Sequence, residues 1–269
     1  MFKLCGLVLG LAAILGALVW GIITFQNREE PIQLATPSQP VKKILFHTDG
    51  VLPDQWLDSA IDLRSGMTLM EVDIHEMKRL LESQGQVKTA AVEREFPDAL
   101  KIVLKERIPV LRMKVAGADD RPELRIVARD GTIYKGEGYS TDRLSELPYV
   151  VPYRYPGGGV QPMRGIDKVA DLIDVARRTQ PAFFKTWRSV NLKYYSGDLD
   201  LAGQVIEVKS SMVPRLIFGT RVDFAQQLER LAVILNYVQS RGNPAIKRID
   251  LSLQDSAAVQ FESGRISTF

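Results

Sequence analysis

The fold of this 269-residue chain is decided by the stretch FPDALKIVLKERIPV, residues 96–110. Apolar residues occupy every second position from Leu100 to Leu104, which is typical of a strand with one buried face. Residues 87–96 alternate in the same way, and the Pro-Asp pair that follows them favours a turn. The stretch therefore predicts two antiparallel strands, the second over residues 100–106, joined by a tight turn.

Upstream of this hairpin the pattern indicates one strand and two helices. Residues 43–47 predict a short strand, and Pro53 suits the first turn of a first helix. In a second helix Asp73 is the expected N-cap, with Glu76 three residues later as its capping-box partner. The expected domain, residues 42–110, thus has the order strand, helix, helix, strand, strand.

The amino-terminal residues predict a membrane anchor. The run from Leu4 to Phe25 carries no charge, and a helix of about 22 residues is about 33 Å long, enough to cross a hydrocarbon core of about 30 Å. Bulky residues at its end do not suit signal-peptide cleavage. We expect a cytoplasmic tail at residues 1–3, a transmembrane helix at residues 4–25 that contacts the lipid bilayer, and a proline-containing linker at residues 26–41.

Composition limits the function of the exported part. The net charge of the whole chain, +3, is spread without long basic runs, so no nucleic-acid partner is expected. Cys5 is the one cysteine and lies in the expected anchor, which excludes a disulfide framework and a thiolate metal site beyond it.

Beyond residue 110 the pattern changes to short strands with two helices between them. We expect a larger mixed β-sheet domain with flanking helices over residues 111–262, followed by a carboxy-terminal tail at residues 263–269, so the fold class is α+β. The expected strands are 124–128, 132–134, 189–195, 199–201, 205–209, 215–218, 246–253 and 257–261, and the expected helices are 166–176 and 224–238.

No catalytic, cofactor-binding or metal site is expected. His47 and His75 lack a partner at useful spacing, and we interpret both as surface histidines. The carboxylates of Asp198 and Asp200 resemble a metal pair, but they lie beside a tight turn and we expect them to face solvent. Gly157 to Gly159 follow a proline-rich loop rather than a strand, which favours a flexible loop over a phosphate cradle.

Several of these stretches together resemble the FtsQ/DivIB cell-division family. The most legible is residues 96–110, which ends in Glu-Arg-x-Pro. The similarity continues in residues 128–134, 147–148 and 217–219, the last leading into the helix at 224–238, and it ends in residues 249–253 and 257–259. The resemblance implies that residues 42–110 form a POTRA domain and that the following residues form an FtsQ-type β domain. The family often has a longer cytoplasmic tail, and it usually has Arg-Tyr where this chain has Ser252-Leu253.

The resemblance implies a non-catalytic scaffold of the division machinery, the divisome. Such a protein is a single-pass protein of the cell inner membrane, with its amino terminus in the cytoplasm, its bulk in the periplasm and its expected place at the division septum. It links early and late division proteins by binding small single-span coiled-coil proteins of the FtsB and FtsL type. Septal peptidoglycan synthases and other divisome proteins are further expected partners.

A terminal strand at a sheet edge can accept a partner segment as a further strand. We therefore predict that Leu251, Leu253, Asp255, Val259 and Phe261 line the partner site. The alternative is that Leu251 and Val259 are core residues. Of the five, Phe261 is the strongest candidate for partner contact. An aromatic side chain near a loose carboxyl terminus has few core residues to pack against, and aromatic residues are enriched at binding hot spots.

Two other functions fit an anchored POTRA-like chain. One is a POTRA-bearing subunit of a secretion or envelope-assembly system, although an outer-membrane barrel needs many more alternating strands than follow Val110. The other is an anchored cell-wall enzyme, for which no active-site constellation is evident.

Overall fold

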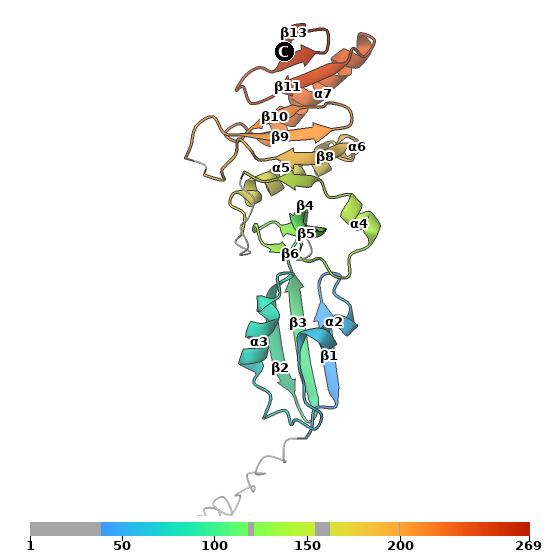
Figure 1. The fold of residues 1–269 in the computed structure, drawn as a ribbon, viewed down its shortest axis with the longest axis vertical. Coiled ribbons are helices and arrows are strands. Elements are labelled where there is room, and N and C mark those ends of the chain that lie inside the picture. The colour runs from blue at the N-terminus through green and yellow to red at the C-terminus, as the bar shows by residue number, and fades with distance from the viewer. Residues whose placement is uncertain (1–38, 118–120, 154–161, 199) are drawn as a thin grey trace, which may run out of the picture.

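The computed structural model describes residues 39–117, 121–153, 162–198 and 200–269. In these residues the chain forms two domains that follow one another along the long axis of the molecule (Figure 1). The expected transmembrane helix at residues 4–25 lies outside the described part. Within the described part, every helix is too short or too polar to cross a bilayer.

The first domain has the predicted order of elements. These are β1 (Lys43–Thr48), α2 (Asp54–Ala60), α3 (Ile74–Ser83), β2 (Val87–Glu95) and β3 (Ala99–Glu106). Strand β3 lies in the middle of the sheet, parallel to β1 and antiparallel to β2.

The period of two in β3 produces the core of this domain. Leu100, Ile102 and Leu104 are fully buried, and both helices pack on the face that these residues form. The carboxylate of Asp73 accepts hydrogen bonds from the backbone N–H groups of His75 and Glu76, both at 2.9 Å, which confirms the predicted N-cap.

The second domain is built on a ten-stranded sheet with the order β13-β12-β11-β10-β9-β8-β7-β4-β5-β6. Its elements in chain order are β4 (Pro109–Ala116), β5 (Pro122–Ala128), β6 (Ile133–Tyr134), α4 (Thr141–Ser145), β7 (Tyr149–Val151), α5 (Ile166–Thr179), α6 (Pro181–Phe184), β8 (Trp187–Asn191), β9 (Val205–Ser210), β10 (Leu216–Gly219), α7 (Phe224–Ser240), β11 (Ile246–Asp250), β12 (Ala258–Phe261) and β13 (Ile266–Thr268).

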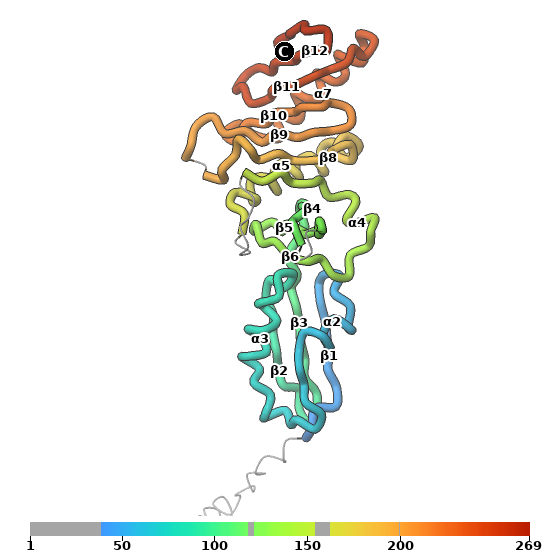
Figure 2. Tube along the Cα trace, in the orientation of Figure 1, coloured from blue at the N-terminus to red at the C-terminus, as the bar shows by residue number. Residues whose placement is uncertain are grey.

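Helices α5, α6 and α7 cover one side of this sheet. In β9 and β12, buried residues alternate with partly exposed ones, so only one face of these strands is packed. The buried faces of the three helices join the strands in one continuous core. Figure 2 shows the strands stacked along the molecule towards the carboxyl terminus. Together the two domains confirm an α+β fold in the described residues.

The structure corrects the predicted strands in several places. The strand predicted at residues 199–201 is wrong for Asp200 and Leu201, because both lie in a turn. Leu199 lies outside the residues that the structure describes. Strands β4, β7 and β13 and helices α4 and α6 were not predicted. Strand β4 begins at Pro109, so the boundary expected after residue 110 falls inside it.

At the end of the first domain that faces the second, a buried carboxylate connects three segments of the chain by hydrogen bonds. Glu106, 9% exposed, accepts hydrogen bonds from the Thr48 hydroxyl at 2.7 Å, from Leu52 N–H at 2.8 Å and from the Gln86 amide at 2.8 Å. The Gln86 side chain also donates to the carbonyl of Glu137 and accepts from its N–H. Through Gln86, the Glu106 network therefore reaches the second domain.

Two further contacts hold the domains at this junction. The Arg107 guanidinium donates to Asp130 at 2.8 Å and to the carbonyls of Gly85 and Val87. Gly138 has a φ of +77°, and a Cβ there would lie 2.0 Å from the carbonyl oxygen of Val51. The close approach of the two domains thus requires glycine at this position.

We expect Glu106→Ala to destabilise the protein by roughly 2–3 kcal/mol, because two buried donors and one partly buried donor lose a charged acceptor. The measurement is urea unfolding of the full chain in neutral detergent, with Glu95→Ala, an exposed carboxylate of β2, as the matched control. Equal unfolding midpoints for the two variants would show that the Glu106 network is not a stabilising junction.

Candidate partner-binding site

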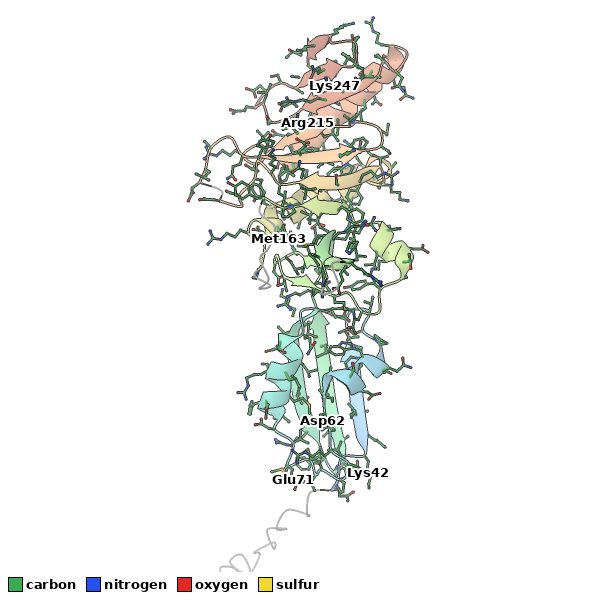
Figure 3. The ribbon with its side chains drawn as sticks, in the orientation of Figure 1. Lys42, Asp62, Glu71, Met163, Arg215 and Lys247 are labelled. Carbon is green, nitrogen blue, oxygen red and sulfur yellow. The ribbon has the colours of Figure 1, made fainter. Side chains whose placement is uncertain are left out.

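The carboxy-terminal end of the large sheet is formed by β11, β12 and β13. Strand β12 is antiparallel to both neighbours, with Val259 opposite Ile249 on one side and Ser267 on the other. Lys247 of β11 and Arg215 lie at this end of the molecule, whereas Lys42 and Glu71 lie at the opposite end (Figure 3).

The structure corrects the predicted edge. Residues 257–261 were expected to form the edge strand and residues 263–269 a tail, but β13 within that tail pairs with β12 and takes the edge position. The last residue is also fixed: Phe269 and Ala257 exchange backbone hydrogen bonds, and the Phe269 ring meets that of Tyr237 edge-on at 5.2 Å. The carboxyl terminus is therefore packed rather than loose.

The five residues predicted to line the site divide into two groups. Leu251, Val259 and Phe261 are buried in the core of the second domain, so Phe261 does have a core to join, and the reasoning that singled it out is wrong. Leu253 is 44% exposed and Asp255 is exposed, so both remain accessible to a partner.

The connection that carries Leu253 and Asp255 is held by an arginine that the sequence analysis missed. Arg230, on α7, donates to the carbonyls of Leu253 at 3.0 Å, Gln254 at 3.0 Å and Ser256 at 2.8 Å. A guanidinium can serve several acceptors at once, because its N–H groups are fixed in one plane. Arg230 thereby shapes the loop between β11 and β12.

The start of the same loop is fixed by Asp250. Its carboxylate accepts hydrogen bonds from the Ser252 hydroxyl at 2.6 Å, from Ser252 N–H at 3.1 Å and from Arg248 at 2.5 Å. Burial opposes ionisation of Asp250, but the bonds from Ser252 and the charge of Arg248 outweigh it and lower the pKa of the carboxyl.

The edge of β13 presents unpaired backbone groups. Residues 265, 267 and 269 face β12, since Phe261 N–H donates to Arg265 and Phe269 pairs with Ala257. In an antiparallel ladder the intervening residues direct their N–H and C=O groups to the other side. Ile266 and Thr268 therefore offer theirs at the open edge, and the Ile266 side chain is 67% exposed.

The histidines and aspartates that could serve in catalysis lie on the surface. His47 and His75 are exposed on β1 and α3. The Asp198 carboxylate accepts a hydrogen bond from Asp200 N–H at 3.1 Å and so caps a turn. Gly157 to Gly159 lie outside the described residues. Among the described residues, no three histidine, cysteine or acidic side chains gather in a way that could hold a metal ion.

Comparison with known proteins assigns the first domain to a type. A family model for the POTRA domain of FtsQ type matches residues 39–107, which are the first domain of the structure. The first domain is therefore a POTRA domain of the FtsQ type, and the matches support the resemblance to the FtsQ/DivIB family. This confirms the POTRA assignment made from the sequence.

Relatives of this chain carry the corresponding name. The cell division protein FtsQ of Mycobacterium bovis is 28% identical to it over 129 residues. The FtsQ proteins of two Mycobacterium tuberculosis strains match to the same extent. The aligned region is 47% of this chain and 38% of each relative, so the chain spans less than half of the relatives that it matches.

We expect Arg230→Ala to loosen the loop after β11, because three carbonyls lose their donor. The backbone amides of Ser252 and Ala257 should then exchange hydrogen about tenfold faster, a local cost of about 1.4 kcal/mol. Hydrogen exchange followed by mass spectrometry measures this, with Glu229→Ala on the exposed side of α7 as the control. Unchanged exchange would mean that Arg230 does not order the loop.

Asp250 predicts a pH dependence at the same place. Because its pKa is lower in the folded state, its charge stabilises the fold fully above about pH 5, and this contribution is lost as pH falls through the lowered pKa. Asp250→Asn should therefore lower the urea midpoint at pH 7 and have a smaller effect at pH 3. An equal effect at both pH values would contradict the charged role of Asp250.

Proposed function

We propose that this protein is a non-catalytic scaffold of the bacterial division machinery. The FtsQ-type POTRA domain and the names of the mycobacterial relatives support a role in cell division. In this proposal the chain is held in the cell inner membrane by residues 4–25, with the two domains in the periplasm at the division septum.

The single observation that carries the proposed mode of binding is the open edge of β13. A partner segment of FtsB or FtsL type adds there as a further strand and pairs with the outward backbone groups of Ile266 and Thr268. Main-chain pairing gives affinity, and the exposed side chains of Ile266, Leu253 and Asp255 give specificity. Leu251, Val259 and Phe261 support the strands from the core side.

The alternatives of a secretion subunit and a cell-wall enzyme are weaker. The match is to the FtsQ type of POTRA domain, and the relatives are division proteins. Septal peptidoglycan synthases remain proposed partners of the POTRA domain or of other surfaces.

Ile266→Pro tests the edge directly, because proline removes an outward-facing N–H while Ser267 keeps its place opposite Val259. We expect binding of the full chain to an FtsB-type partner to weaken about tenfold, equivalent to about 1.4 kcal/mol. Affinity is measured with purified proteins in neutral detergent.

Ile266→Ala is the matched variant, because it shortens the same side chain and keeps the N–H. It should bind more tightly than Ile266→Pro. If the proline variant keeps an intact β13 by hydrogen exchange and binds as well as the unmodified chain, strand addition at this edge is wrong.

A further inference from the structure

A second surface with the features of a binding site lies in the middle of the large domain. It is a pocket of about 760 Å³ between the end of α4, strands β4 and β7, and helix α6 with the start of β8. A pocket of this size accommodates several side chains of a peptide.

Cations dominate the lining of this pocket. Arg112, Arg177, Lys185 and Arg188 line it together with one carboxylate, Glu146, so the lining has a formal excess of 4 − 1 = 3 positive charges. Within the described residues none of the four cations forms an ion pair. Arg112 donates to the carbonyl of Ser145 at 3.3 Å, and Arg177 lies in the field of Asp174 and Glu146, so Lys185 and Arg188 are the cations most available to a ligand.

Aromatic rings orient two of these guanidinium groups. Arg112 and Tyr149 lie opposite each other on the paired strands β4 and β7, and the Arg112 guanidinium lies 4.1 Å from the centroid of the Tyr149 ring. The guanidinium of Arg177 lies 4.9 Å from the centroid of the Phe184 ring. A guanidinium stacked on a ring keeps its N–H groups at the edge, where they can hold a carboxylate by two parallel hydrogen bonds.

Two buried donors in the wall of the pocket lack an acceptor. The indole N–H of Trp187, a side chain only 5% exposed, and Nε of Arg112 have no hydrogen-bond partner in the described structure. Buried donors without a partner are costly, so proteins rarely keep them without a reason. Both atoms are enclosed within the wall, so an acceptor in the pocket would reach them only after the surrounding side chains shift.

From the charge excess and the guanidinium groups held over aromatic rings, we propose that this pocket binds an acidic peptide segment of a partner protein. One carboxylate lies between Arg112 and Arg177, further acidic residues face Lys185 and Arg188, and an apolar side chain lies against Pro181. The apolar part of the pocket lining favours a peptide over a free inorganic anion, because an inorganic anion has no apolar group to pack against it.

The acidic-peptide pocket is separate from the edge proposed for strand addition. In the sheet order β9, β10, β11 and β12 lie between β8 and β13. The proposal therefore goes beyond strand addition and does not depend on it, since loss of binding at the pocket leaves β13 unchanged.

The test is binding of a fluorescein-labelled peptide of alternating Glu and Leu residues to the full chain in neutral detergent at low salt. A peptide with Gln in place of Glu is the control ligand. The test variant is Lys185→Glu with Arg188→Glu, since both residues are exposed at the pocket. The matched control is Arg178→Glu with Lys193→Glu, which makes the same charge change at exposed residues outside the pocket.

We expect the acidic peptide to bind, the Gln peptide to bind at least about tenfold more weakly, and the test variant to lose about tenfold in affinity. The matched control should change affinity less than about twofold. An equal loss in both variants, equal binding of the Gln peptide, no binding of the acidic peptide, or its displacement by equimolar inorganic phosphate would each overturn the proposal.

Discussion

The arrangement of the two domains depends on a charged group buried where they meet. Glu106 ends the central strand of the POTRA sheet. Its carboxylate accepts hydrogen bonds from Thr48 of β1, from Leu52 just before α2, and from Gln86. Gln86 in turn bonds both backbone groups of Glu137. A buried carboxylate is stable only while these donors stay in place, so the network resists bending between the domains.

The open edge of the large sheet lies at the end of the second domain away from this junction (Figure 1). The sheet starts at β6, beside the POTRA domain, and ends at β13, at the far end of the molecule (Figure 1). Helices cover one side of it, and neighbouring strands satisfy the backbone groups between its ends. The outward N–H and C=O groups of Ile266 and Thr268 therefore lie at the opposite end of the molecule from residue 39, the first residue that the structure describes (Figure 1).

Much of the fold follows from the sequence because its signals are local. The alternation around Ile102 and the cap at Asp73 predict the POTRA domain, and the long helix from Phe224 is evident from its spacing. Strand β4 also carries an alternating signal, with Leu111 and Met113 buried, but the predicted domain boundary after residue 110 divides this strand. Strands β7 and β13 have three residues each, too few for a period to show.

The candidate site was harder to predict because its edge is a tertiary property. Nothing local in residues 266–268 indicates that they cover β12, and that pairing is what buries Phe261 and frees Ile266. Arg230 looks like any polar residue of an amphipathic helix, and its three carbonyl acceptors lie more than twenty residues away. The cations of the pocket come together from separate elements in the same way.

The central claim is that a partner strand adds at β13. Site-specific photo-crosslinking from position 266 of the full chain in its native membrane, compared with position 88 on the POTRA sheet, tests it most directly. The account predicts an adduct with a small single-span coiled-coil protein from position 266 and none with that protein from position 88. Capture of that protein from position 88 alone would contradict the claim.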